Sequence, residues 1–499
     1  MKQRIVAFLL CALMLVPMLL VACNDGSTST DSKGTSLDVG GTGDSLDTAE
    51  RLEVPEGIEF DGENFYVLSA GNVAYNDFGY KEDTTENVVI QAQQKRAAFV
   101  ETLYDIVIEE EIVVDKNSKG GGPGYTKIAE SVLSNTVVYH LGIIGGYDVA
   151  SLARSNLLYD LNSVPYVDTT KSWWDQNANE DLTIKGLLLF TNGSLSAAYS
   201  ESTFAMFFNK ELAAQHLTDD QNPYDLVKEH KWTIDKFSEL AKGVSVDLNG
   251  NGETDYDDRF GFYVWDDSVI GMIEAAGSKI CTVDESGKIN LTLYNENTLN
   301  MFNSYTEIAF DNANSLTYQR YSGKINTLGN WESGHTLFWA NSTGIIPTIR
   351  TMETDFGILP YPMLSEEQDR YYSTIAPYNS QFICIPLVQE DIEFVGAITE
   401  ALAYYGKEYV TPAVFEQALK GLYSRDEESY DMLDIIFSSY GYDLGLYYQI
   451  GTYPTRLLNL VRNKSTAFNS MYEGYEIPAK SEIEALNASF DLVVESWKD

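Results

Sequence analysis

Apolar residues along this chain recur with two alternating periods, one typical of strands and one typical of helices. ENFYVLSAG (63–71) and IVIEEEIVV (106–114) have strand character, and residues 87–104 between them have helix character. A second helix is predicted at 125–135, before the apolar run VVYHLGII. Strand, helix, strand, helix and strand in this order predict a mostly parallel sheet with helices on both faces.

The same alternation continues to the end of the chain. Further strands are predicted for the apolar runs TFAMFFN, RFGFYVW, GHTLFWANS, DFGILPYP and FICIPLV, and further helices for residues 391–406, 411–422, 426–438 and 481–497. Roughly 440 residues follow position 57, which is too many for one hydrophobic core and favours two lobes. No apolar run in this part approaches the ~20 residues that span a bilayer.

The N-terminus has the layout of an export signal. Residues 1–22 place Lys2 and Arg4 before a long apolar run without acidic residues. The run ends LVAC, so we predict a lipoprotein signal in which Cys23 is acylated; an ordinary signal with a chance cysteine is the alternative. Residues 23–57 are rich in Ser, Thr, Gly and Asp, which predicts a flexible tether that holds the body at the outer face of a membrane.

The charge of the chain excludes one class of partner. The formal net charge is −41, and such a surface repels nucleic acid, whereas it favours solubility and the binding of cations or neutral ligands. Besides Cys11 and Cys23, only Cys281 and Cys384 remain. They could form a disulfide outside the cell, but each lies in an apolar stretch, so we predict buried free thiols.

The stretch DLNGNGETDYDD (247–258) has the spacing of a calcium loop. Such a loop needs oxygen side chains at positions 1, 3, 5 and 12, a carbonyl at 7 and Gly at 6, where Gly252 stands. The predicted ligand residues are Asp247, Asn249, Asn251, Glu253, Asp255 and Asp258. The flanks predict a helix before the loop and a strand after it, which favours a structural Ca²⁺ over a switch; a solvated Asn/Gly/Asp turn is the alternative.

Sequence motifs of enzymes are absent from the chain. The four histidines, His140, His216, His230 and His335, have no zinc-ligand spacing, and there is no nucleophile elbow or phosphate-binding loop. Aromatic residues make up 12% of the chain, and several tryptophans stand beside Asn, Asp, Ser or Thr. Aromatic faces stack on sugar rings while amides and carboxylates bind hydroxyls, so this mixture suits a carbohydrate cleft; core packing is the alternative for each tryptophan.

Several longer segments together resemble one known family. They are, in chain order, YDLNSVPYVDTTKSWWDQNANEDLTI, TFAMFFNKELA, PYDLVKEHKWTIDKFSELAKGVSVDLNGNGETDYDDRFGF, SGHTLF, DFGILPYP, YYSTIAPYNSQFICIP and SRDEESYDMLDII. This series resembles the extracellular solute-binding lipoproteins of ABC transporters, family 1 or sugar-type, which are distantly similar to maltose-binding protein. The resemblance covers nearly all of the chain after the tether.

The resemblance implies a fold with two α/β lobes. In this type II periplasmic-binding-protein-like fold, mixed sheets are flanked by helices, and crossing strands form a hinge that closes around the ligand. Lobe one is expected to hold residues 58–204 plus 378–440, and lobe two residues 205–377 plus 441–499, with the calcium loop. The crossings are expected near 205–209 and 374–381.

The same resemblance implies a set of ligand contacts in the cleft. The expected residues are Gly145, Gly146, Tyr147, Trp174 and Asn177 from lobe one, Trp265, Trp339 and Asn341 from lobe two, and Tyr372 and Tyr378 at the return crossing.

The expected function is therefore binding without catalysis. A monomeric, membrane-tethered protein at the extracellular face would capture a sugar or oligosaccharide and deliver it to an ABC permease. Two alternatives are a secreted carbohydrate-active enzyme and a surface sensor or adhesin without a transport role.

Overall fold

The computed structural model describes residues 50–496, except for residue 56, residues 74–76, residues 79–86, residue 117 and residues 416–424. The predicted signal peptide, the acylation site Cys23 and most of the predicted tether lie outside the described residues. Among the described residues, no helix is both long enough and apolar enough to span a bilayer.

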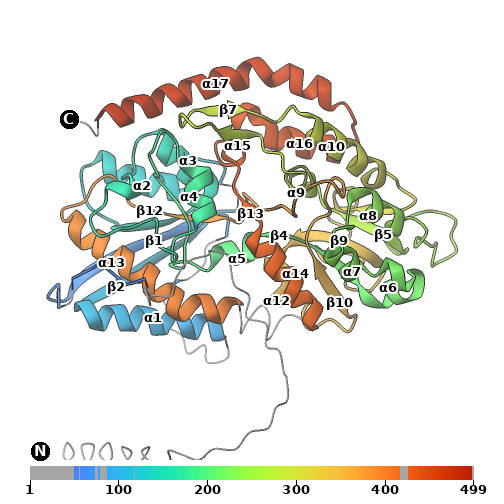
Figure 1. The fold of residues 1–499 in the computed structure, drawn as a ribbon, viewed down its shortest axis with the longest axis horizontal. Coiled ribbons are helices and arrows are strands. Elements are labelled where there is room, and N and C mark those ends of the chain that lie inside the picture. The colour runs from blue at the N-terminus through green and yellow to red at the C-terminus, as the bar shows by residue number, and fades with distance from the viewer. Residues whose placement is uncertain are drawn as a thin grey trace, which may run out of the picture. The chain divides into compact units, whose positions relative to one another are not determined.

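The first sheet contains the N-terminal strands and one strand from late in the chain. Its strands, in the spatial order β12-β3-β1-β2, are β12 (Gln381–Cys384), β3 (Leu141–Gly145), β1 (Glu63–Gly71) and β2 (Ile106–Val114). β1 pairs in parallel with β2 and β3, which confirms the predicted strand–helix alternation, and β12 pairs antiparallel with β3. Its helices are α1 (Val88–Tyr104), α2 (Pro123–Leu133), α3 (Gly146–Arg154) and α13 (Ile392–Tyr405). Figure 1 shows α1 and α13 on one face and α2 and α3 on the other.

The second sheet is mixed and lies entirely within residues 204–359. Its strands, in the spatial order β10-β4-β9-β5-β8, are β10 (Phe356–Leu359), β4 (Phe204–Asn209), β9 (Thr336–Ser342), β5 (Phe260–Val264) and β8 (Ser315–Thr317). β5 runs parallel to β8 and β9, while β4 is antiparallel to both β9 and β10. Nearly every strand residue is buried, as expected for a sheet that is covered on both faces.

Short helices surround this second sheet. They are α6 (Lys210–His216), α7 (Pro223–Lys228), α8 (Ile234–Ala241), α9 (Ser268–Ala275), α10 (Glu296–Ala309), α11 (Tyr318–Tyr321) and α12 (Ile346–Ile349). Side-chain caps begin several of them; Thr233, for example, accepts a hydrogen bond from the amide of Lys236 at the start of α8.

The chain passes between the two sheets through two short segments that lie side by side. Thr203 bridges to Ile375, and the amide of Ala376 donates to the carbonyl of Ser202 at 2.7 Å. Beside them, β11 (Ser373–Thr374) pairs in parallel with β13 (Tyr440–Gly441). The predicted two-lobed α/β fold with a hinge of crossing strands is confirmed.

One predicted lobe boundary differs from the structure. The helix α14 (Glu427–Ser438), expected in lobe one, packs against β10 and α7 of the second sheet. Before it, the Arg425 guanidinium donates to the carbonyl of Thr354, and the Tyr224 hydroxyl donates to Asp426. Arg425 and the residues of α14 therefore already lie on lobe two, so the return is not at residue 441.

The remaining elements lie outside the two main sheets. They are α4 (Gln176–Leu182), α5 (Ala198–Ser202), the hairpin β6 (Cys281–Val283) and β7 (Ile289–Leu291), the π-helical turn Gly406–Val410, α15 (Leu444–Tyr447), α16 (Tyr453–Arg462) and α17 (Phe468–Ser496).

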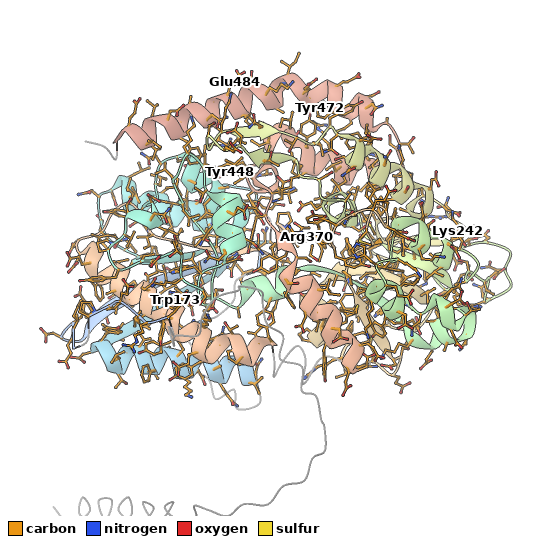
Figure 2. All side chains as sticks on the ribbon, in the orientation of Figure 1. Trp173, Lys242, Arg370, Tyr448, Tyr472 and Glu484 are labelled. Atoms are coloured by element: carbon orange, nitrogen blue, oxygen red, sulfur yellow. The ribbon has the colours of Figure 1, made fainter. Side chains whose placement is uncertain are left out.

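The long helix α17 contacts both lobes. Glu482 pairs with Arg154 of α3 at 3.0 Å, and Asn487 accepts a hydrogen bond from the amide of Ile289 in β7 at 2.9 Å. Tyr472, on α17, stacks on Tyr453 of α16 with ring centroids 5.5 Å apart (Figure 2). The thiols of Cys281 and Cys384 are free and buried, as the sequence predicts.

Candidate functional site

The carboxyl ends of three parallel strands meet at one edge of the second sheet. Trp265 follows β5, Tyr318 follows β8, and Asn341 lies near the end of β9. In open α/β sheets, ligands bind beyond the carboxyl ends of the strands. Two of the expected contacts, Trp265 and Asn341, therefore lie at the edge where a ligand is expected.

Two aromatic rings at this edge are stacked face to face. The rings of Trp265 and Tyr318 have centroids 4.3 Å apart and planes 2° apart. Both side chains are half-buried. The Nε1–H of Trp265 is buried and has no hydrogen-bond partner within the described chain. Because buried polar groups are normally paired, this donor lacks a partner that a water molecule or a ligand could supply.

A charged network lies directly behind the stacked rings. The carboxylate of Asp266 is buried, receives the Nε–H of Arg462 at 2.5 Å and accepts a hydrogen bond from the Gln319 amide at 2.7 Å. Oε1 of Gln319 is buried and unpaired among the residues that the structure describes. The network fixes the Gln319 side chain and leaves its oxygen free to accept a hydrogen bond.

The carboxyl edge of the first sheet carries a second set of polar groups. Asn72 follows β1, and its amide donates to the carbonyl of Tyr378 at 3.2 Å, while its Oδ1 has no partner in the described part of the chain. The Tyr378 ring is 44% exposed, and its hydroxyl donates to the carbonyl of Lys116 at 2.9 Å. Tyr147 follows β3 at the same edge.

Tyr147, Tyr378 and Asp267 bring the two edges together. Burial raises the pKa of the Tyr147 hydroxyl, and the nearby Asp267 and Tyr378 raise this pKa further. Tyr147 belongs to lobe one and Asp267 to lobe two, so they interact across the space between the lobes. Burial, and after it the charge of Asp266, raise the pKa of Asp267 to about 7, although the positive charge of Arg462 lowers this pKa. The carboxyl of Asp267 can thus donate or accept a hydrogen bond near neutral pH.

The expected contacts Gly145 and Gly146 have a packing role instead. Both are buried. A Cβ at Gly145 would lie 3.0 Å from Cα of Gly71, and a Cβ at Gly146 would lie 2.8 Å from the ring of Tyr447. These glycines allow β3 and the start of α3 to approach their neighbours closely, and no side chain fits there.

Two expected tryptophan contacts lie in the core. Trp174 is 2% exposed, and its Nε1–H donates to Glu400 of α13 at 2.9 Å; Trp173 donates to the same carboxylate at 2.8 Å. Trp339 is fully buried against Trp331 and neighbouring rings of the second sheet. The structure therefore corrects the prediction for Trp174 and Trp339, because neither ring has a face open to a ligand.

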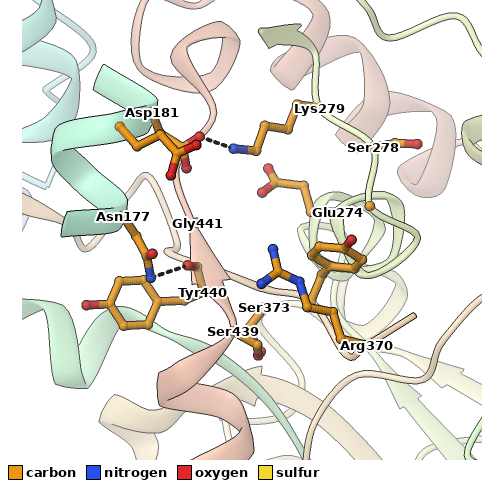
Figure 3. Close-up of a pocket in the computed structure, with 13 residues that line it drawn as sticks. Asn177, Asp181, Glu274, Ser278, Lys279, Arg370, Ser373, Ser439, Tyr440 and Gly441 are labelled. Carbon is orange, nitrogen blue, oxygen red and sulfur yellow. Dashed lines mark hydrogen bonds and ion pairs between the residues drawn. The ribbon is translucent and has the colours of Figure 1, made fainter. Parts of the chain in front are cut away.

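Asn177 and Tyr372 lie at a different place, beside the hinge. Both line a cavity of about 270 Å³ whose floor includes the hinge strands β11 and β13 (Figure 3). The Asn177 amide donates to the carbonyl of Tyr440 at 3.0 Å. The residues that line this cavity do not include Trp265, Asp267 or Tyr147.

Comparison with known proteins identifies the fold. No protein-family model and no curated protein matches the sequence. Among solved structures, the chain is similar to the cyclic α-maltosyl-1,6-maltose binding protein of Arthrobacter globiformis, with a TM-score of 0.55 and 12% identity over 86% of this chain and 100% of that one.

Two further solved structures agree with the first. The GacH receptor of Streptomyces glaucescens, solved unliganded and with acarbose, has a TM-score of 0.53 and 13% identity over 85% of this chain and 98% of that one. A family 1 extracellular solute-binding protein of Bifidobacterium longum subsp. infantis has a TM-score of 0.51 and 16% identity over 86% and 100%. The chain has the fold of sugar-type solute-binding proteins.

Within this solute-binding fold, the predicted calcium loop connects α8 to β5. An antiparallel bridge between Val246 and Arg259 closes its base, and Gly252 has the positive φ of 78° that the turn at position 6 needs. The carboxylate of Asp247 accepts hydrogen bonds from the amides of Gly250 and Gly252, and buried Asp258 accepts from the amides of Leu248 and Asp255.

The other predicted ligands of the loop form similar turns. Asn249 and Asn251 each accept a hydrogen bond from the amide two residues ahead, Glu253 is exposed, and Asp255 accepts from the amide of Asp257. Across the described residues, no three His, Cys, Asp or Glu side chains are grouped as metal ligands. A cation in this loop would therefore depend on the asparagine oxygens and a backbone carbonyl as well as the carboxylates.

Several residues at the carboxyl edge of the second sheet were not predicted from the sequence. Asp266 and Asp267 directly follow Trp265, so their position after a strand was a usable signal. Tyr318 and Gln319 follow β8, whose three residues are too short to show a strand period. Arg462 approaches from α16, far along the chain, and no local pattern indicates this contact.

Proposed function

We propose that this chain is an extracellular solute-binding protein that captures a sugar or an oligosaccharide for import by an ABC transporter. The observation that carries the proposal is the stacked pair Trp265 and Tyr318 at the carboxyl edge of lobe two, with Asp267 of that edge interacting with Tyr147 of lobe one. Similarity of fold to proteins described as binding acarbose or a cyclic maltosyl-maltose supports the choice of ligand class.

The chemistry of the two edges suits a sugar. A pyranose ring has an apolar CH face, which stacks on an aromatic ring, and a rim of hydroxyls, which need donors and acceptors. The Nε1–H of Trp265 supplies a donor, and Oε1 of Gln319 and Oδ1 of Asn72 supply acceptors, all without a partner within the described chain. Each unpaired atom lowers the stability of the empty protein and favours the bound state.

Closure of the lobes would complete the site. Asn72, Tyr147 and Tyr378 stand on lobe one, whereas Trp265, Gln319 and Asn341 stand on lobe two. A ligand that contacts both sets is held only when the lobes are close, so its binding energy favours the closed form. The crossing strands at Thr203 and Ile375 are short enough to serve as the hinge.

The predicted lipoprotein signal completes the proposal. Acylation of Cys23 and the tether 23–57 would keep the body at the extracellular face of the membrane, beside the permease. The carrier is proposed to act as a monomer, to transfer its ligand to the permease and to catalyse no reaction.

A ligand screen tests this function. Residues 58–499 are purified, and their melting temperature is measured with mono- and oligosaccharides, including maltose, maltotriose and cyclic glucans. A ligand at 100 times its Kd stabilises the native state by about 2.7 kcal/mol, which raises the melting temperature measurably. Saturable stabilisation by one sugar class, without turnover of that sugar, supports the proposal. Turnover favours a carbohydrate-active enzyme, and tight binding without any permease interaction favours a sensor or adhesin.

We also propose a structural role for Ca²⁺ in the loop 247–258. The ion would be held by Asp247, Asn249, Asn251, Asp255 and Asp258 with the carbonyl of Glu253, and it would relieve the repulsion among the three aspartates. Because the loop joins α8 to β5, the ion would stiffen lobe two next to the strand that positions Trp265.

A further inference from the structure

The hinge-side cavity is lined by residues from both lobes. Its volume is about 270 Å³. Lobe one contributes the α4 residues Asn177, Glu180 and Asp181, and lobe two contributes α9 and the loops after it and before β11. Figure 3 shows this space between α4 and α9, with the strand at Tyr440 and Gly441 along one side. The volume is below the range of drug-sized pockets and suits a small molecule.

Glu274 supplies an unpaired carboxylate oxygen to this cavity. The side chain is 5% exposed, and its Oε1 has no hydrogen-bond partner among the described residues. Figure 3 shows the carboxylate directed into the cavity. Burial, together with the charge of Asp443, raises the pKa of Glu274 well above its ordinary value. The oxygen lacks the hydrogen-bond donor or cation that a buried carboxylate needs.

Arg370 supplies the opposite charge at the mouth of the cavity. Its side chain is exposed, and its guanidinium lies over the ring of Tyr372, 4.8 Å from the centroid. Within the described chain, no carboxylate pairs with this guanidinium, whose five N–H groups match a carboxylate. Figure 3 shows it directed into the same space as the carboxylate of Glu274.

Two of the other charged groups of the wall are paired with each other, whereas the exposed carboxylate of Glu180 has no ion pair within the described chain. Lys279 of lobe two pairs with Oδ1 of Asp181 at 2.5 Å, and Oδ2 of Asp181 accepts the amide of Tyr442 at 2.8 Å. No three acidic, His or Cys side chains are grouped here or elsewhere in the described residues as metal ligands. Within the described chain, the groups of the wall that lack a partner are therefore the buried Oε1 of Glu274 and the exposed side chains of Arg370 and Glu180.

We propose that the hinge-side cavity binds a small zwitterion of α-amino-acid size, with its ammonium group at Oε1 of Glu274 and its carboxylate at the guanidinium of Arg370. An ammonium supplies the donor that Glu274 lacks, and a carboxylate forms a bidentate pair with Arg370. A ligand with one charge leaves one of the two groups unpaired. The lining of this site does not include the residues of the edge at Trp265, so the proposal stands independently of the sugar-binding proposal.

Calorimetric titration of the complete folded body tests the site. The probes are glycine, L-alanine and L-glutamine, with methylammonium and acetate as half-ligands that carry one charge each. We expect at least one amino acid to bind at least tenfold more tightly than either half-ligand. Binding by none of the amino acids, or methylammonium binding as tightly as the best amino acid, overturns the proposal.

Variants assign the binding to the two named groups. We expect Glu274→Gln and Arg370→Ala each to weaken amino-acid binding at least tenfold, whereas Arg320→Ala, a matched exposed arginine on lobe two, leaves it unchanged. Glu274 is buried, so its variant is compared only after its melting temperature is measured. Arg370 is exposed and its variant is expected to fold, so unchanged affinity in Arg370→Ala overturns the proposal.

Discussion

The indole ring of Trp265 lies flat against the ring of Tyr318, with centroids 4.3 Å apart. The two residues are more than fifty positions apart in the sequence, yet each directly follows a strand, and those strands, β5 and β8, are parallel neighbours. Parallel pairing therefore brings two aromatic residues that are distant in the sequence into contact at the sheet edge, where each ring covers one face of the other. We expect the uncovered part of this pair to contact the ligand.

Trp265→Ala should weaken sugar binding. Removing a central aromatic contact costs about 1–2 kcal/mol, so the affinity should fall roughly fivefold to thirtyfold. The Kd of the sugar found in the screen is measured by calorimetry for the wild type and the variant. Tyr294→Ala, an exposed aromatic of lobe two away from this edge, is the control and should bind normally. Equal affinity of Trp265→Ala and the wild type would contradict the assignment of the site.

Trp339→Ala should lower stability and not ligand affinity. The ring is fully buried against Trp331 and Phe207, so its removal leaves a cavity and costs about 3–5 kcal/mol. Urea denaturation measures the free energy of unfolding, and calorimetry under native conditions measures the Kd of the sugar. A large loss of affinity in a variant with unchanged stability would place Trp339 back in the binding site.

Gly146→Ala tests the packing role of this glycine. The added methyl group would lie 2.7 Å from Oγ of Ser380 and 2.8 Å from the ring of Tyr447. Overpacking of this kind costs about 1–3 kcal/mol, so the melting temperature should fall. Gly186→Ala, where the structure has open space around the Cβ but φ is positive, separates the steric effect from backbone strain. Wild-type stability of Gly146→Ala would refute the packing role.

Glu400 should make stability depend on pH. Burial raises its pKa in the folded protein to about 7 from 4.5, against the lowering effect of the hydrogen bonds from Trp174 and Trp173. The folded state therefore holds a proton that the unfolded state has lost, and this contribution is complete below pH 4.5 and disappears as the pH rises through 7. The shift corresponds to about 3 kcal/mol.

Denaturant unfolding at pH 5 and pH 8 measures this effect. The wild type should lose more stability between the two pH values than Glu400→Gln, because the amide does not ionise. Asp267, whose folded pKa is also raised, acts in the same direction in both proteins and cancels in the comparison. The same loss in both proteins would exclude Glu400 as the source.

Removal of Ca²⁺ should lower the melting temperature. Excess EDTA would leave the carboxylates of Asp247, Asp255 and Asp258 without a counter-charge, and Ca²⁺ at 100 times its Kd should restore about 2.7 kcal/mol. Asp255→Asn should reduce the response to Ca²⁺, whereas Asp257→Asn, whose side chain is not among the predicted ligands, should keep it. A melting temperature that is the same with EDTA and with Ca²⁺ would refute the ion.

The sequence predicted the lobes better than the ligand contacts. The run TFAMFFN is buried throughout, and IVIEEEIVV, an edge strand that is largely exposed, is rich in β-branched residues, so both strands were predictable. Tryptophans are different, because the same ring suits a core or a sugar, and only the position in the fold separates Trp265 from Trp174 and Trp339. The helix α17 also begins earlier than the predicted start at 481, because Pro478 lies inside it and normally indicates a helix end.

The double attachment of α17 affects how this protein is completed during synthesis. Residues 468–496 leave the ribosome after both sheets, and they then bind Arg154 of one lobe and Ile289 of the other. The two lobes can fold as they emerge, but their shared surface stays uncovered until this last helix arrives. A product that stops before residue 468 would lack both contacts of α17 and would expose the residues that this helix covers to proteases.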